Sequence, residues 1–87
     1  MKRAIFPGSF DPFTKGHFDI VMRGLEIFDE IIIGIGINST KKETFPLQQR
    51  LNDIQQYFAA EPRVQVHTYD GLTVDFAAQH NAQFILR

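Results

Sequence analysis

The segment from Glu30 to Ile37 constrains the fold of this chain more than any other segment. It reads Glu-Ile-Ile-Ile-Gly-Ile-Gly-Ile, an almost continuous run of isoleucine and glycine. A strand with one face in water alternates apolar and polar residues, whereas a run without polar positions is typical of a strand covered on both faces. Such strands belong to parallel sheets with helices on either side, so the segment predicts an α/β fold.

Short β-rich runs and helical patterns alternate around this segment. The other expected strands are Arg3–Phe6, Val64–Tyr69 and Phe84–Leu86. Two expected helices carry apolar stripes at helical spacing, Phe18, Val21, Leu25 and Phe28 in the first and Leu47, Leu51, Ile54 and Phe58 in the second. Pro46 stands at the first turn of the second helix, and a shorter third helix is expected from Leu72 to His80. The order βαβαβαβ predicts a Rossmann-like parallel sheet with right-handed crossovers.

The length of 87 residues allows one domain at most, because domains usually run to ~100–150 residues. The chain closes on Phe84-Ile85-Leu86-Arg87, an apolar run typical of a buried strand. Natural domains rarely end inside a core strand. We therefore expect residues 1–87 to be the N-terminal part of a longer, truncated α/β domain.

Composition argues against several classes of function. The chain has no cysteine, which excludes a disulfide framework and a thiolate metal site. Its longest apolar stretch, Ile31–Ile37, is far shorter than the ~20 residues that span a bilayer. Nine basic and ten acidic residues give a net charge of −1 without a basic block, which argues against nucleic-acid binding. A soluble, cytoplasmic protein is expected.

The loop after the first expected strand, Pro7–His17, carries the most chemistry. In parallel sheets ligands bind beyond the carboxyl ends of the strands, where loops lead into helices. Gly8 allows a ligand to approach the backbone closely, and Ser9 offers a hydroxyl and an amide. His17 opens the first helix, at the positive end of its dipole and beside free N–H groups. Together these groups suit a polyphosphate.

The same residues also have ordinary structural roles. Gly8 and Pro12 can mark turns, Thr14 is a good N-cap, and His17 can be a surface residue of the first helical turn. The chemistry of the loop alone leaves the functional and the structural interpretation open.

The whole string resembles a family signature. Gly-Ser-Phe-Asp-Pro-Phe-Thr-Lys-Gly-His, from Gly8 to His17, is similar to the [HT]-x-G-H motif of nucleotidyltransferases, which join a nucleoside monophosphate to a phosphorylated acceptor. Thr14 at the first motif position, Asp19-Ile20-Val21 after it and Asn38–Lys42 after the second strand narrow the resemblance to the phosphopantetheine adenylyltransferase family. The resemblance runs through all 87 residues, including Gly71–Ala77 and the C-terminal run.

The resemblance implies an enzyme that transfers the adenylyl group of ATP to 4′-phosphopantetheine, giving dephospho-coenzyme A and pyrophosphate. On the nucleotide side it implies that Ser9 and Phe10 contact the nucleotide, Phe10 through its backbone. His17 is then the catalytic residue, which stabilises the charge that grows on the α-phosphate. Magnesium is implied as the cofactor, bound largely through phosphates and water rather than by a protein cage.

On the acceptor side the resemblance implies four contacts, from Ser9, Lys41, Thr73 and Arg87. Lys41 and Arg87 would hold the acceptor phosphate, and Thr73 would lie against the pantetheine arm. Position 73 is commonly apolar in the family, and Pro46 stands where a hydroxyl cap is usual. Lys42 is interpreted as a solvated loop charge.

The resemblance also bears on the rest of the protein. It implies a homo-oligomer and coenzyme A as a product-like inhibitor, with no nucleic-acid or membrane partner. The second half of the family domain supplies a Gly-x-Arg turn, an acidic residue on the adenine side and a serine-rich triphosphate loop, none of which is present in these 87 residues. Residues 1–87 are thus expected to be the N-terminal part of a single nucleotidyltransferase domain, with little or no activity alone.

Three alternatives stay open at this point. A sister nucleotidyltransferase could use another phosphorylated acceptor, although such enzymes usually have histidine at the position of Thr14. A non-catalytic nucleotide-binding or assembly module could have kept the same fold. A receiver-type signalling domain needs clustered carboxylates after its first strand, where this chain offers Asp11. His67 and His80 show no metal-ligand spacing and are interpreted as structural or surface residues.

Overall fold

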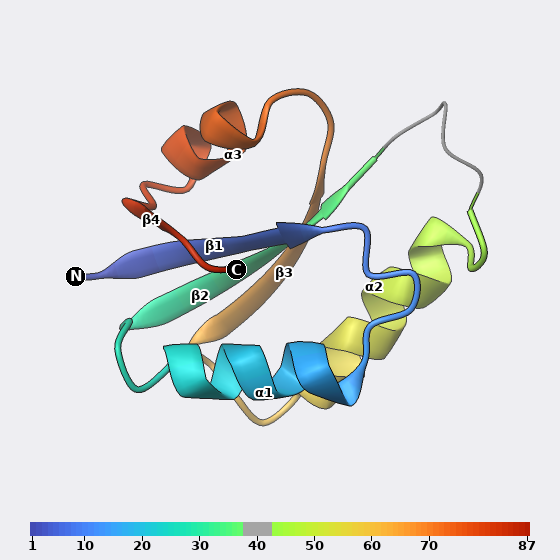
Figure 1. Ribbon diagram of the computed structural model, residues 1–87, viewed down its shortest axis with the longest axis horizontal. Helices are drawn as coiled ribbons and strands as arrows, with labels where there is room; N and C mark the ends of the chain where they lie inside the picture. The colour runs from blue at the N-terminus through green and yellow to red at the C-terminus, as the bar shows by residue number, and fades with distance from the viewer. Residues whose placement is uncertain (38–42) are drawn as a thin grey trace.

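A four-stranded parallel sheet forms the centre of the computed structural model, which describes residues 1–37 and 43–87. Its strands lie in the order β3-β2-β1-β4, as Figure 1 shows. Their bounds are β1 (Arg3–Gly8), β2 (Glu30–Gly36), β3 (Val64–Tyr69) and β4 (Phe84–Ile85). All three pairings are parallel, so the predicted Rossmann-like α/β fold is confirmed.

The three predicted helices are present and cover both faces of the sheet. They are α1 (Lys15–Gly24), α2 (Leu47–Tyr57) and α3 (Thr73–Gln79). Figure 1 shows α1 and α2 on one side of the sheet and α3 on the other. Pro46 is the N-cap of α2 rather than part of its first turn. Within the described residues, none of the helices is long and apolar enough to cross a membrane.

The first helix is shorter than its apolar stripe predicts. It ends at Gly24, with Leu25 as its C-cap, and a turn follows in which the N–H groups of Ile27 and Phe28 both donate to the Gly24 carbonyl. The Asp29 N–H then donates to the Lys2 carbonyl, which leads the chain into β2. Leu25 and Phe28 still pack on the core, but from this turn and not from the helix.

The isoleucines of β2 point alternately to two hydrophobic cores. Ile31, Ile33 and Ile35 belong to the core on the α1 and α2 side, and all three are fully buried. Ile32 packs with Ile5 and α3 on the opposite side. Both faces of β2 are therefore covered, as its sequence predicts.

Gly34 allows α3 to pack closely on the sheet. The rings of Tyr69 and Phe76 stack over it with centroids 4.3 Å apart. A Cβ atom at Gly34 would lie 2.5 Å from Cε2 of Phe76, closer than carbon atoms can approach, and 3.0 Å from Cε1 of Tyr69. The missing side chain of Gly34 thus makes room for α3 on this face of the sheet.

Gly34→Ala should lower the free energy of unfolding by about 1–3 kcal/mol, the usual cost of forcing an extra carbon into a packed core. Urea titration of the two proteins measures the difference. The matched control is Gly36→Ala, because a Cβ at Gly36 meets its nearest atom, the Tyr69 hydroxyl, at 3.6 Å. Equal losses for the two variants would contradict the role of Gly34.

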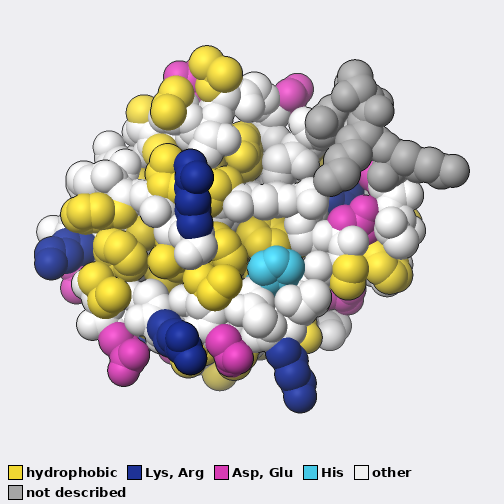
Figure 2. All heavy atoms as spheres, viewed as in Figure 1, with side chains coloured by type: hydrophobic (Ala, Val, Ile, Leu, Met, Phe, Trp, Pro, Cys, Tyr) yellow, Lys and Arg dark blue, Asp and Glu magenta, His cyan; other side chains and the backbone are white. Residues whose placement is uncertain are grey.

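The fourth strand is shorter and more exposed than the sequence predicts. Phe84–Leu86 is predicted to be a buried strand, but β4 contains only Phe84 and Ile85, each 43% exposed. The reason is that β4 is the edge of the sheet beside β1, so it pairs on one side among the described strands. The Phe28 ring contacts Phe84 with centroids 5.2 Å apart. Figure 2 shows hydrophobic side chains gathered on the surface of this region.

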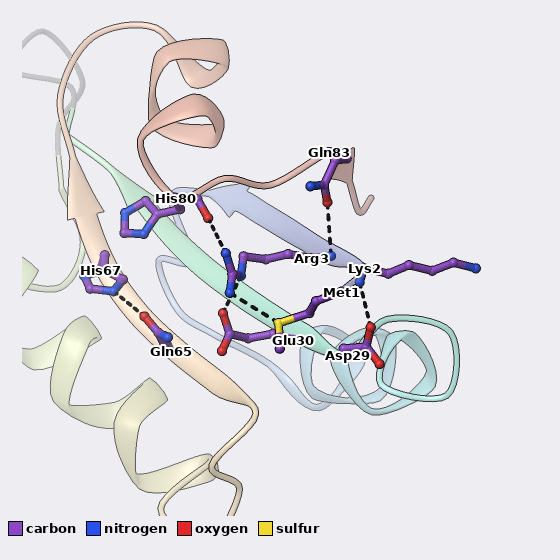
Figure 3. A network of polar contacts seen from close by, with 9 residues as sticks. All are labelled: Met1, Lys2, Arg3, Asp29, Glu30, Gln65, His67, His80 and Gln83. Atoms are coloured by element: carbon purple, nitrogen blue, oxygen red, sulfur yellow. Dashed lines mark hydrogen bonds and ion pairs between the residues drawn. The ribbon is translucent and has the colours of Figure 1, made fainter.

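A polar network fixes the end of α3 to the start of the sheet (Figure 3). Arg3 donates from Nη1 to the His80 carbonyl at 3.1 Å. Its Nε lies 2.6 Å from Oε1 of Glu30, as an ion pair without hydrogen-bond geometry. The His80 ring packs on the His67 ring with centroids 4.6 Å apart, and His67 in turn contacts Gln65. Both histidines are therefore structural, as the sequence interpretation has it.

Lowering the pH below about 6.5, the ordinary pKa of histidine, should destabilise the fold through this network. Burial lowers the pKa of His80, and the charges of His67 and Arg3 lower it further against the opposing effect of Glu30. His80 therefore takes up a proton more readily in the unfolded chain, so the free energy of unfolding is highest above that pH and decreases as the pH falls. Urea titrations at about pH 7.5 and pH 5.5 measure the decrease.

A control separates this contribution from that of His17, whose pKa is also lowered by burial and which gives a slope of the same sign. His80→Gln and His17→Gln should each flatten part of the pH dependence. An unchanged slope in His80→Gln would contradict the contribution of the network.

Candidate functional site

The loop between β1 and α1 borders a small, open cavity at the carboxyl end of the sheet. The cavity has a volume of about 320 Å³ and is lined by residues 6–12 together with His17. Ser9, Phe10 and His17, the three residues expected on the nucleotide side, thus lie around one space. This is the edge of the sheet where ligands of parallel α/β proteins bind.

Thr14 and His17 hold each other in a capping box at the start of α1. Thr14 is the N-cap, and its hydroxyl oxygen accepts the His17 N–H at 3.4 Å. In return the Thr14 N–H donates to Nδ1 of His17 at 3.0 Å. Because Nδ1 accepts this bond, the proton of the neutral imidazole is on Nε2. The ring therefore offers Nε2–H as a hydrogen-bond donor beside the cavity.

The structure confirms the N-cap interpretation of Thr14 and places His17 beside the cavity. One detail differs from the prediction. The His17 N–H is used in the cap, so this amide is not open to an anion at the helix N-terminus.

Aromatic rings surround the imidazole of His17. The Phe10 ring meets it edge-on at a centroid distance of 5.0 Å, Phe13 lies at 5.3 Å and Phe6 at 6.1 Å. This burial lowers the pKa of His17, and the positive end of the α1 dipole disfavours the imidazolium as well. At neutral pH the ring is accordingly an uncharged donor, whose hydrogen bond gains strength as negative charge grows on an acceptor.

Phe10 lines the cavity, although its side chain is part of the core. The side chain is 4% exposed and packs on Phe6 with centroids 5.1 Å apart. Its φ of 49° turns the loop sharply. A Cβ atom at Gly8 would lie 3.0 Å from the Phe10 ring. Gly8 thus makes room for this ring, whereas the sequence predicts room for a ligand.

Of the expected acceptor-side residues, Ser9 lines this cavity, whereas Thr73 and Arg87 do not. The Thr73 hydroxyl, in the first turn of α3, shares a hydrogen bond of 3.0 Å with the hydroxyl of Tyr69. Arg87 is exposed and lies two residues beyond the end of β4. Lys41 and Lys42 lie outside the described residues.

Sequence reasoning missed one charged residue of this region. Arg50 is a buried arginine, 5% exposed, on the core-facing side of α2. A signal for it exists in the sequence, because Arg50 falls three residues after Leu47 and four before Ile54, within the apolar stripe. A charged residue at such a position requires buried partners.

Comparisons with known proteins show the family of the chain. The model of the cytidylyltransferase-like family matches residues 5–87. The chain belongs to this family. Among curated members, the phosphopantetheine adenylyltransferases of Phocaeicola vulgatus and Bacteroides fragilis are 56% and 54% identical over 87 residues. Those alignments cover 100% of this chain but 58% of each relative, so the chain spans less than two thirds of the relatives' length.

Two solved structures share this architecture. NadR protein, in complex with NAD and AMP-PNP, superposes with a TM-score of 0.74 at 16% identity, over 93% of this chain and 28% of its own. A bifunctional NMN adenylyltransferase/ADP ribose pyrophosphatase from Francisella tularensis, complexed with AMP and a manganese ion, gives 0.65 at 23% identity, over 91% and 25%. At these identities the likeness supports the fold alone.

Proposed function

We propose that the protein containing this chain transfers the adenylyl group of ATP to 4′-phosphopantetheine, forming dephospho-coenzyme A and pyrophosphate. The observation that carries the proposal is the fixed tautomer of His17, which offers Nε2–H beside a cavity lined by Ser9 and Phe10. The curated relatives at 54–56% identity, which are named phosphopantetheine adenylyltransferases, supply the substrate class.

The reaction is a direct displacement at phosphorus. An oxygen of the acceptor phosphate attacks the α-phosphorus of ATP in line, the bond from that phosphorus to the bridging oxygen breaks, and pyrophosphate leaves with the bonding electrons. The acceptor phosphate is already anionic at neutral pH, so no protein nucleophile is required. Catalysis then depends on positioning the two substrates and on stabilising the charge of the transition state.

Each site residue has a defined part in this proposal. His17 donates from Nε2 to an oxygen of the α-phosphate, and Ser9 and the Phe10 amide hold phosphate oxygens at the cavity. On the acceptor side, Lys41 and Arg87 hold the phosphate and Thr73 contacts the pantetheine arm. The neutral state of His17 suits its part, since a neutral donor binds the transition state, with its greater charge on oxygen, more strongly than the ground state.

Magnesium is part of the proposal and fits the donor set as a phosphate-bound ion. Within residues 1–37 and 43–87, no three His, Asp or Glu side chains are grouped as metal ligands. Mg²⁺ commonly keeps several waters and binds through substrate phosphates. When bound, the ion supplies positive charge to the leaving phosphates.

The proposal extends to the protein as a whole. Residues 1–87 form the N-terminal part of a single nucleotidyltransferase domain, which acts in the cytoplasm as a homo-oligomer. Coenzyme A, which resembles the product, is expected to bind the acceptor site and inhibit.

A panel of acceptors tests the substrate class. Pyrophosphate release from ATP should depend on 4′-phosphopantetheine and be absent with nicotinate mononucleotide or glycerol 3-phosphate. Release with one of those acceptors instead would assign a sister nucleotidyltransferase. Binding of ATP without release for any acceptor would favour a non-catalytic module.

A further inference from the structure

Arg50 joins two loops at the carboxyl end of the sheet. Its Nη1 donates to the Ser9 carbonyl at 2.7 Å, and its Nε donates to the Phe45 carbonyl at 3.0 Å. Its Nη2 lies 2.8 Å from Oε1 of Glu43. One planar guanidinium thus binds both the loop that surrounds the cavity and the segment that precedes α2.

Asp11 links the same two loops in the opposite direction. Its carboxylate oxygens accept the N–H groups of Thr44 and Phe45, each at 2.7 Å. The β1–α1 loop therefore gives a carbonyl to Arg50 and a carboxylate to the backbone of residues 44 and 45. These bonds form a reciprocal cross-link, which we call the loop staple (Arg50, Asp11 and the backbone groups they bind).

Of the contacts that Arg50 makes, its hydrogen bonds to the two backbone carbonyls stabilise it most. The Glu43 side chain is 53% exposed, so water screens its attraction for Arg50 and the ion pair contributes little. The Arg50 side chain is 6% exposed, and a charge so far from water depends on the hydrogen bonds that replace its hydration. The carbonyls of Ser9 and Phe45 are the principal partners of Arg50, so its guanidinium holds both carbonyls in fixed positions.

Fixing the Ser9 carbonyl also fixes the direction of the next amide. In a trans peptide unit the C=O and the following N–H point in opposite directions. Arg50 draws the Ser9 carbonyl toward α2, so the Phe10 N–H points away from α2. Ser9 and Phe10 both line the cavity next to His17, and the cavity is therefore shaped by a residue that does not line it.

We propose that Arg50 is a positioning residue, which aims the Ser9–Phe10 peptide at the phosphates of the bound nucleotide, with Asp11 as its counterpart across the staple. The inference rests on the proposed function for its substrate, but the geometry of the staple is independent of the reaction. Arg50 acts through Ser9 and Phe10 and makes no contact with substrate itself.

The test compares Arg50→Lys with Arg63→Lys in the protein at the length its gene encodes. Arg63 is the matched control because it too donates from Nη1 to a backbone carbonyl, that of Leu25 at 3.1 Å, and pairs with a glutamate, but it does not line the cavity. Lysine keeps the charge and loses the planar fork. Asp11→Asn tests the other half of the staple. Steady-state kinetics, direct binding of ATP and thermal unfolding are measured for each variant.

Arg50→Lys should raise the KM and the dissociation constant for ATP by roughly 10- to 100-fold, the effect of misplacing a binding group by about an ångström. Asp11→Asn should act in the same direction, and Arg63→Lys should leave both constants within a few-fold. If Arg50 had a purely structural role, a smaller fraction of the variant protein would be active, which would lower kcat at an unchanged KM. That result, or equal effects from Arg50→Lys and Arg63→Lys, would overturn the proposal.

Direct ATP binding separates this inference from the proposed function. If the parent protein binds ATP but transfers no adenylyl group to any acceptor, the proposed function fails. The staple is then judged on the dissociation constants alone, where a weakening specific to Arg50→Lys and Asp11→Asn supports it. A parent protein that does not bind ATP overturns both.

Discussion

His17→Ala should lower kcat by roughly two to three orders of magnitude, equivalent to about 2.7–4 kcal/mol of lost transition-state stabilisation. The Thr14 N–H fixes the ring so that Nε2–H is its donor, and that donor acts where charge develops during the displacement. The KM values for ATP and 4′-phosphopantetheine should change much less, because the interaction strengthens only as the transition state forms. Steady-state kinetics with both substrates varied measure the two effects separately.

His80→Ala is the matched control for this prediction. His80 is also a partly buried histidine with a lowered pKa, but it packs on His67 at the far end of α3 and does not line the cavity. Its loss should affect stability and leave kcat near that of the parent. Turnover of His17→Ala within a few-fold of the parent would remove His17 from the mechanism.

Lys41→Ala should raise the KM for the acceptor by roughly 10- to 100-fold, the loss expected when a charge-assisted bond to a phosphate disappears. Lys41 follows the buried strand β2 in the sequence, and in the proposed function it holds the acceptor phosphate. The KM for ATP should change less. Varying each substrate in turn gives the two constants.

Lys42→Ala provides the comparison, since it removes the same charge one residue further along the chain. We expect it to have little effect on either substrate, as a solvated loop charge would. A larger effect from Lys42 than from Lys41, or equal losses for ATP and acceptor from Lys41→Ala, would assign the acceptor phosphate to another residue.

The elements of the fold follow from the sequence where periodicity and burial agree. The Ile-Gly run of β2 is covered on both faces, and the stripes of α1 and α2 face one core. The sequence does not predict where a helix or strand ends, because the hydrogen bonds at its end determine that position. Leu25 and Phe28 continue the helical stripe but belong to a turn. Phe84 and Ile85 have the apolar character of core residues, yet their exposure depends on which elements lie beside β4, and no local pattern carries that information.

In the site as well, contacts between residues close in the sequence can be predicted, whereas contacts that depend on the tertiary fold cannot. Thr14 and His17 are three residues apart, so their contact follows from local helix geometry. The contact of Arg50 with Ser9 joins residues 41 apart and depends on how α2 lies against the β1–α1 loop. Only the interruption of an apolar stripe by arginine marks the position in the sequence. Likewise, the Phe10 ring fills the space that Gly8 leaves, which neither residue indicates alone.

Adenylyl transfer to 4′-phosphopantetheine at the β1–α1 loop is the reaction that we propose. Its most direct test is the purified protein, at the length its gene encodes, incubated with ATP, Mg²⁺ and 4′-phosphopantetheine while pyrophosphate and dephospho-coenzyme A are both quantified. We expect the two products in equal amounts, with neither formed when the acceptor is omitted. Pyrophosphate released without the acceptor, or ATP bound with no product formed, would contradict the account.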